Sequence, residues 1–259
     1  MIETQFSIYH LEFILLIFIR IASMVYLVPV LGSTNVPQKV KIGFSFVLAI
    51  LLATVIPYEP LPYTTILGYT GLVIKEVIVG LLIGFFMNIC MVILSFAGQH
   101  IDQEIGFTMV SMFDPFNKTQ TTITANLYNI LVLLVVVVSN LYYFIIDALA
   151  DSFQYVPVGT DIFKLDAIFD VFMKFMKDFF VIGFQISLPI FASALLLNVI
   201  LGILAKSAPQ MNMFVIGIQL KVFLGLSVLL VTIGFLPVIT EFIFDEMKSL
   251  VELLYGALS

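Results

Sequence analysis

Apolar residues run along this chain in long, unbroken stretches and do not alternate with polar ones as in a half-buried strand. Six such stretches are Leu11–Leu31, Val40–Ile56, Leu72–Ala97, Leu127–Leu149, Phe179–Leu204 and Phe214–Ile239. About 20 apolar residues in a helix cross the hydrocarbon core of a bilayer, and a helix satisfies its own backbone hydrogen bonds there. The pattern predicts an all-α integral membrane protein of about six long helices, organised as a single membrane domain over residues 1–259.

Two connections between these stretches carry patterns of their own. Residues 161–178 place apolar side chains at helical spacing with acidic residues and lysines between them, which predicts an amphipathic helix at an interface or against a partner helix. The connection His100–Asn126 contains an apolar segment, Gly106–Phe116, that is too short to span a bilayer. Within the fifth stretch, Pro189 predicts a kink.

Composition supports a membrane protein and argues against several other classes. Hydrophobic residues make up 61% of the chain and charged residues 11%, whereas soluble domains have about 45–50% and about 25%. The net charge of −6 argues against a nucleic-acid partner. The single cysteine, Cys90, excludes an intrachain disulfide. Without a metal-ligand pattern or a phosphate-binding motif, we expect no metal, no cofactor and no enzymatic activity.

Charged residues inside the apolar stretches are the first candidates for function, because such charges are costly in a membrane. They are Arg20, Lys75, Glu76 and Lys221. Glycines follow or flank them at steps of four, at Gly80, Gly84, Gly217 and Gly225. Small residues at this spacing let a second backbone approach closely. Two interpretations stay open, packing against another helix or a path for an ion, and such faces serve packing far more often.

The segment Gly106–Phe116 is a second candidate, because large flexible side chains crowd it. These side chains are Phe107, Met109, Met112, Phe113 and Phe116. Methionine adapts to irregular gaps, and non-helical backbone at membrane depth is buried in protein or lines a cavity. The segment is therefore either a loop packed between helices or a deformable seal across a wide opening.

Three stretches together carry a resemblance to a known family. The first runs from Arg20 to Pro29 and on to Gly32, Pro37, Lys39 and Lys41. The second joins Lys75 and Glu76 to Gly80 and Gly84, and continues to residues 97–99, Asp102 and Gly106. The third, Leu204–Phe214, contains an interhelical turn with Lys206, Pro209, Gln210 and Asn212, and leads to Gly217, Lys221 and Gly225. Over nearly its whole length the chain resembles the FliR family, the R subunits of the flagellar type III export apparatus, whose injectisome counterparts are the T subunits.

This resemblance implies a fold similar to a fused P-like and Q-like export subunit with kinked helices. It implies a structural, non-enzymatic role in the gated protein-conducting channel that exports flagellar rod, hook and filament proteins. The implied location is the bacterial cytoplasmic (inner) membrane, within the flagellar basal body. The implied partners are the P-type and Q-type subunits (FliP and FliQ), the B-type subunit (FlhB) and unfolded export substrates in transit.

The resemblance also assigns roles to residues. It makes Gly106–Phe116 a channel plug, with Phe107, Met109, Met112 and Phe113 at the closed lumen. It makes the four intramembrane charges bridges between helices or subunits. The alternatives are an injectisome subunit, a transporter of small solutes or ions that uses Lys75 and Glu76, and an assembly factor that leaves the finished machine. Overall likeness favours the flagellar channel.

Overall fold

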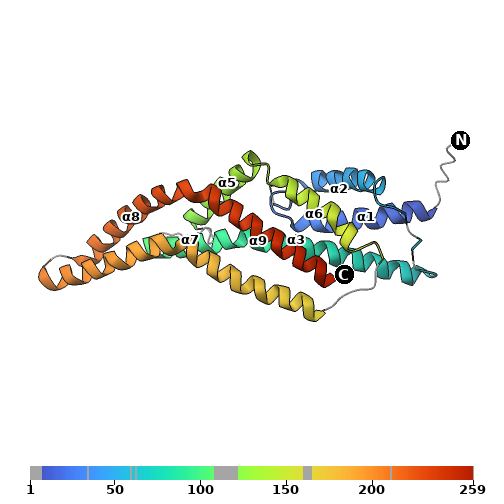
Figure 1. Ribbon diagram of the computed structural model, residues 1–259. Coiled ribbons are helices and arrows are strands. Elements are labelled where there is room, and N and C mark those ends of the chain that lie inside the picture. The colour runs from blue at the N-terminus through green and yellow to red at the C-terminus, as the bar shows by residue number, and fades with distance from the viewer. Residues whose placement is uncertain are drawn as a thin grey trace. The chain divides into compact units, whose positions relative to one another are not determined.

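Every regular element that the structure describes is helical. The computed structural model describes residues 8–33, 35–58, 60–61, 63–107, 122–159, 165–210 and 212–258 (Figure 1). The helices are α1 Ile8–Leu27, α2 Gln38–Ala53, α3 Ile66–Ile105, α5 Ile123–Val138, α6 Tyr142–Tyr155, α7 Leu165–Ser207, α8 Met213–Thr232, the 3-10 turn η1 Ile233–Phe235 and α9 Leu236–Leu258. The predicted all-α membrane fold class is confirmed.

The helices that can cross a membrane differ in number and bounds from the six apolar stretches. Among the residues that the structure describes, four qualify by length and composition: His10–Leu27, Ile66–Ile105, Leu165–Ser207 and Met213–Leu258. A fifth is present if α5 and α6, which meet at 74°, count as one broken span. The stretch Val40–Ile56 forms α2, whose 16 residues rise only about 24 Å, short of the roughly 30 Å hydrocarbon core.

Two other differences have local causes. The stretch Leu127–Leu149 breaks between α5 and α6, where Asn140 adopts a left-handed backbone with φ of 58°, a conformation that asparagine tolerates. The amphipathic pattern at residues 161–178 does not form a separate helix over the described residues. From Leu165 onward it is the beginning of the 43-residue α7, which continues through Pro189 to Ser207, because neither Gly nor Pro separates the two patterns.

Contacts divide the chain into two compact units. The first consists of Met1–Cys90, Asn140–Lys174 and Asp245–Ser259, and the second of Met91–Ser139 and Phe175–Phe244. Helices α3, α7 and α9 contribute residues to both units, while α1, α2 and α6 belong to the first unit and α5 and α8 to the second.

The first unit is built on the close approach of α1 and α3. A Cβ atom added to Gly80 would lie 2.3 Å from the carbonyl oxygen of Arg20, and one added to Gly84 would lie 2.7 Å from that of Met24. Only glycine permits backbones to come this close. On α2, the small residues Ser45 and Ala49 are the buried positions, and most of the large apolar side chains of that helix remain exposed.

In the second unit, three glycines again receive neighbouring helices. A Cβ atom on Gly98 would lie 2.5 Å from the Cα atom of Ala125, one on Gly183 would lie 2.4 Å from Cδ1 of Phe96, and one on Gly225 would lie 2.4 Å from Cγ1 of Ile105. These contacts pack α5, α7 and α8 onto the end of α3.

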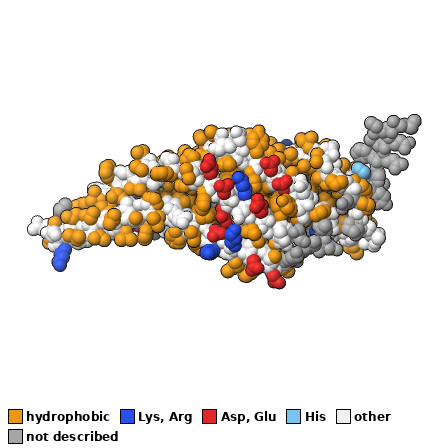
Figure 2. Space-filling model, viewed as in Figure 1, with side chains coloured by type: hydrophobic (Ala, Val, Ile, Leu, Met, Phe, Trp, Pro, Cys, Tyr) orange, Lys and Arg blue, Asp and Glu red, His pale blue; other side chains and the backbone are white. Residues whose placement is uncertain are grey.

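Much apolar surface remains uncovered in this chain. In Leu165–Ser207 and in Met213–Leu258, only 17% of the most apolar stretch is buried, against 50% in α3. Figure 2 shows hydrophobic side chains covering most of the visible surface of the α7–α8 hairpin, with few charges among them. Such a surface requires lipid or protein around it.

The two glycines Gly80 and Gly71, both on α3, should respond oppositely to alanine. Gly80→Ala forces the α1 and α3 backbones apart and should lower stability by about 1–3 kcal/mol. Nothing lies within 4 Å of a Cβ atom at Gly71, so Gly71→Ala should raise helix stability by roughly 0.5–1 kcal/mol. Thermal unfolding of the detergent-solubilised chain measures both effects. Equal midpoints for the two variants would contradict the close α1–α3 contact.

Candidate functional site

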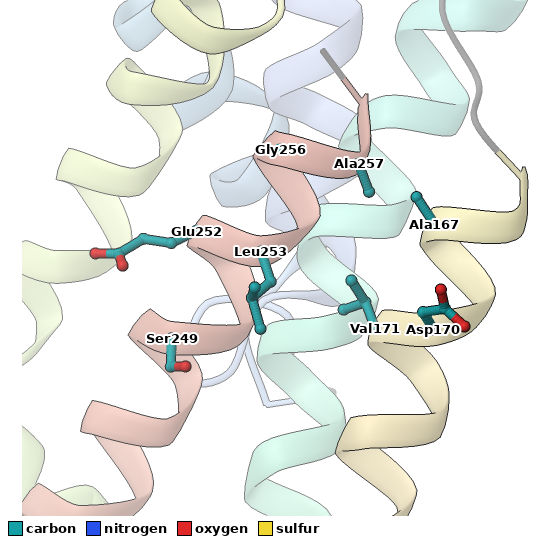
Figure 3. A pocket seen from close by; sticks show the side chains of 8 residues that line it. All are labelled: Ala167, Asp170, Val171, Ser249, Glu252, Leu253, Gly256 and Ala257. Atoms are coloured by element: carbon teal, nitrogen blue, oxygen red, sulfur yellow. The ribbon is translucent and has the colours of Figure 1, made fainter.

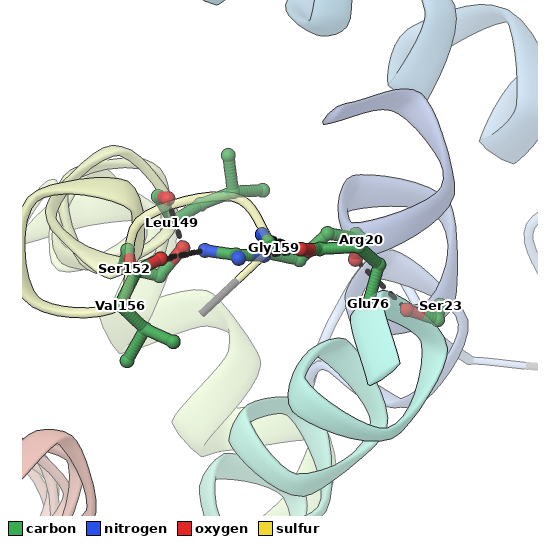
Figure 4. Close-up of polar contacts among 7 residues, drawn as sticks. All are labelled: Arg20, Ser23, Glu76, Leu149, Ser152, Val156 and Gly159. Atoms are coloured by element: carbon green, nitrogen blue, oxygen red, sulfur yellow. Dashed lines mark hydrogen bonds and ion pairs between the residues drawn. The ribbon is translucent and has the colours of Figure 1, made fainter. Parts of the chain in front are cut away.

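A buried ion pair lies in the first unit. Arg20 on α1 and Glu76 on α3 are 1% and 2% exposed, and Nε of Arg20 donates to Oε2 of Glu76 at 2.5 Å (Figure 4). A charge in a low-dielectric interior loses its hydration, so it persists only when partners satisfy it. The pair therefore requires α1 and α3 to stay in contact at this level.

The same guanidinium also binds the end of α6. Nη1 of Arg20 donates to the backbone carbonyls of Ser152, at 3.1 Å, and Val156, at 2.7 Å. The Ser152 carbonyl also accepts the N–H of Val156 at 3.0 Å, and the helix dipole favours a cation at this end of α6. The guanidinium carbon lies 4.3 Å from the centroid of the Phe153 ring, a cation–π contact. Arg20 thus joins three helices.

The second carboxylate oxygen of Glu76 extends the cluster beyond α6. The backbone N–H of Gly159 donates to Oε1 of Glu76 at 3.2 Å. Figure 4 shows Arg20 between Glu76 on one side and Ser152 and Val156 on the other. We call Arg20, Glu76, Ser152, Val156 and Gly159 the charge cluster.

Local helix geometry explains why these side chains meet. Glu76 and Gly80 lie one turn apart on the same face of α3. Because Gly80 lacks a side chain, α1 approaches closely enough for Arg20 to reach Glu76. Ser23 also lies at this contact, since its hydroxyl oxygen would be 2.0 Å from a Cβ atom at Gly80; that hydroxyl donates to the Arg20 carbonyl within α1 at 2.9 Å.

The other two intramembrane charges lie elsewhere. Lys75 is half-buried and precedes Glu76 on α3, about 100° around the helix. Lys221 is half-buried on α8 in the second unit, and has no ion pair among the described residues. One turn before it on α8, Gly217 lies against α7, since a Cβ atom added there would be 3.2 Å from Cδ1 of Leu201.

The predicted interhelical turn joins α7 to α8. Lys206 lies in the last turn of α7, where the helix dipole favours a cation, and Pro209 and Gln210 follow as an exposed turn. Asn212 begins α8, and its side-chain oxygen accepts the backbone N–H of Val215 at 3.5 Å. The turn therefore contains its own helix cap.

A second buried charge, to which the sequence alone assigned no role, lies where α3 ends and α5 begins. Asp102 is 1% exposed, and its Oδ2 accepts the backbone N–H of Thr124 at 3.1 Å. The Thr124 hydroxyl donates to Oδ1 of Asp102. The sequence places Asp102 only among the residues that carry the family resemblance, and no local pattern links it to Thr124, which lies 22 residues further on.

The predicted plug is described only at its beginning. Gly106 has φ of 94°, and the N–H groups of Gly106 and Phe107 donate to the Asp102 carbonyl at 3.0 and 2.9 Å. A glycine with positive φ and this bonding ends a helix in the Schellman manner. Met109, Met112, Phe113 and Phe116 lie outside the described residues.

A groove of about 480 Å³ opens in the first unit between α7 and α9. Its lining includes Asp170 and Glu252, whose carboxylates point away from each other in Figure 3. They do not converge on a shared ligand. In the described part of the chain, no group of three or more His, Cys, Asp or Glu side chains is arranged to hold a metal ion.

Long apolar helices joined by buried charges at their ends define an integral membrane protein whose polar residues hold helices together. Residues 11–247 match the family described as bacterial export proteins, family 1. The chain belongs to that family. The flagellar biosynthetic protein FliR of Bacillus subtilis (strain 168) is 31% identical over 245 residues, which is 92% of this chain and 94% of that protein.

Two further relatives extend the comparison. FliR of Aquifex aeolicus (strain VF5) is 30% identical over 88% of this chain and 86% of its own length. FliR of Escherichia coli (strain K12) is 26% identical over 90% of this chain and 88% of its own length. The resemblance to the FliR family is therefore confirmed, and the chain is a membrane protein of bacterial flagellar export.

The charge cluster should behave as a unit when its members are changed. Glu76→Ala leaves Arg20 as an uncompensated buried charge, as Arg20→Met does for Glu76, and each should cost about 3–5 kcal/mol. The double variant should cost less than the sum of the single variants by about 1–3 kcal/mol. Unfolding of the purified chain in detergent measures all three, and strict additivity would show that the pair does not couple.

Proposed function

We propose that this chain is a structural, non-catalytic subunit of the gated channel through which the flagellar export apparatus passes unfolded proteins across the bacterial cytoplasmic membrane. The observation that supports this most is the uncovered apolar surface of the α7–α8 hairpin. It accompanies buried charges that bind helix ends within the chain. The buried charges are used within the chain, so the apolar surface of α7 and α8 is left for contact with lipid or with other subunits.

One face of α7 favours a protein partner over lipid. Asn198 is exposed and has no hydrogen bond within the described chain, and nothing lies within 4 Å of a Cβ atom at Gly202, one turn further on. An amide facing hydrocarbon is costly, whereas an amide beside a small residue is typical of contacts between membrane helices. We assign this face to a neighbouring subunit of the P or Q type, with the B-type subunit as a further partner of the assembly.

The proposed seal of the channel is the segment Gly106–Phe116. Its flexible apolar side chains suit a constriction that closes by excluding water and opens by deforming. Gly106 follows the end of α3 directly, and Phe107 donates its N–H to the Asp102 carbonyl, so the segment starts from the end of a helix. Energy for transport comes from partners in this proposal.

The charge cluster weighs against the rival transporter. Both carboxylate oxygens of Glu76 are engaged, one by Arg20 and one by Gly159, and the side chain is 2% exposed. A proton relay needs a carboxylate that water reaches. The relatives reported above are all named as flagellar proteins, which favours the flagellar apparatus over the injectisome. Stable retention with P-type and Q-type subunits separates a channel subunit from an assembly factor.

Gly202→Trp should disrupt the proposed partner contact. The indole fills the open space at Gly202 and blocks a neighbouring helix, so recovery of P-type subunit with the tagged chain should fall about tenfold, equivalent to about 1.4 kcal/mol. Ile203→Trp is the matched control, because Ile203 is 63% exposed and lies about 100° around the helix. Equal recovery with both variants would assign the Asn198–Gly202 face to lipid.

Replacing Met112 and Phe113 by glycine should make the assembled channel leak ions, because the proposed seal loses its largest flexible side chains. A potential-sensitive dye in cells that express the complete apparatus measures the leak. Blue native gels of the same membranes establish that the complex has assembled. A normal membrane potential with a normal complex would remove the segment from the sealing role.

A further inference from the structure

Asp102 takes part in both ends of the connection between α3 and α5. Its backbone carbonyl accepts the N–H groups of Gly106 and Phe107, which ends α3. Its carboxylate accepts the N–H group and the hydroxyl of Thr124, in the first turn of α5. The chain therefore leaves one helix and enters the next at hydrogen bonds to a single residue.

The two roles use different atoms of Asp102. The carbonyl belongs to the backbone and is unaffected by a change of side chain, whereas the carboxylate is the only part that reaches α5. The N-terminus of a helix has unsatisfied N–H groups and a partial positive charge. A carboxylate that is 1% exposed is well suited to bind there.

The contacts of α3 with α5 at Gly98 and Ser95 are weaker or less directional than the hydrogen bonds of the Asp102 carboxylate. Gly98 packs against Ala125, and the side-chain amide of Asn129 donates to the Ser95 hydroxyl at 3.2 Å. The Gly98 contact reaches Ala125 in the first turn of α5 by packing alone, and the Asn129 hydrogen bond lies one turn further along α5. The direction in which α5 starts relative to the last turn of α3 thus depends on the Asp102 carboxylate.

We propose that Asp102 is the positioning residue of the α3–α5 connection, because its side chain holds the start of α5 against the end of α3. Asp102 contacts no substrate in this assignment and acts through Thr124. Its consequence for transport rests on the proposed function, in which the residues after Gly106 seal the channel. In that function, the sealing segment lies in sequence between α3 and α5, so a displaced start of α5 should loosen the seal.

Spin labels on the two helices test the positioning role directly. In the full-length chain with Cys90→Ala, labels at Gln103→Cys and Asn126→Cys occupy exposed positions on the last turn of α3 and the first turn of α5. Pulsed electron paramagnetic resonance should give a narrow distance distribution with Asp102 present. Asp102→Leu should broaden it, and Asp102→Asn should restore it, because the amide oxygen still accepts from Thr124.

Two controls separate this result from a general loss of packing. Asn129→Ala removes an α3–α5 hydrogen bond away from the connection and should leave the distribution narrow. If the Asp102→Leu protein does not accumulate, the distance distributions of Thr124→Val and Thr124→Ser are compared instead. The distribution should broaden in Thr124→Val and stay narrow in Thr124→Ser, since only the serine keeps the hydroxyl that donates to Asp102. A distribution that stays narrow in Asp102→Leu, or that is equal in the two Thr124 variants, overturns the assignment.

A second measurement distinguishes failure of this inference from failure of the proposed function. The Asp102 variants are expressed without labels in cells with the complete apparatus, and membrane potential is recorded. A broadened distance with an ion leak in Asp102→Leu, both reversed in Asp102→Asn, supports the positioning role and the seal. A broadened distance without a leak supports the positioning role and overturns the seal. An unbroadened distance overturns the positioning role whatever the potential.

Discussion

A guanidinium that has left water depends on partners inside the protein, and Arg20 finds partners for Nε and Nη1 on two other helices and the turn that follows one of them, while its Nη2 has none among the described residues. Glu76 neutralises its charge, the last carbonyls of α6 accept its second nitrogen, and the Phe153 ring covers its face. The contact with Glu76 is lost if α1 and α3 separate, so the ion pair depends on the glycine contact at Gly80 as much as it supports that contact. The arrangement of α1, α3 and α6 in the first unit follows from this mutual dependence.

The same electrostatic rule operates at the start of α5. Across the bent pair of α5 and α6, the first helix receives a buried carboxylate at its N-terminus and the second receives a buried guanidinium at its C-terminus. Each charge has the sign that the helix dipole favours at that end. A pair of helices too short to be stabilised by length alone is thus held at both outer ends by charges from α3 and α1. Charges that would be costly in hydrocarbon are used where backbone groups would otherwise lack partners.

With Arg20, Glu76 and Asp102 bound inside the protein, the chain presents mainly apolar side chains to its surroundings, above all on α7 and α8. Lipid satisfies most of such a surface. It does not satisfy Asn198, and it leaves the space beside Gly202 without a specific occupant. Both features agree with the assembly proposed above, in which the Asn198–Gly202 face of α7 meets a neighbouring subunit.

Hydropathy and short motifs, read from the sequence alone, determined the helical membrane class, the family and the importance of Arg20 and Glu76. These conclusions follow from one-dimensional properties, since hydrophobic length and residue order are already present in the chain. Only the tertiary structure decided that Arg20 pairs with Glu76, that α5 and α6 are separate helices, and that Asp102 reaches Thr124. Those outcomes depend on distances between residues far apart in sequence, and the close approach of backbones at Gly80 and Gly98 sets these distances.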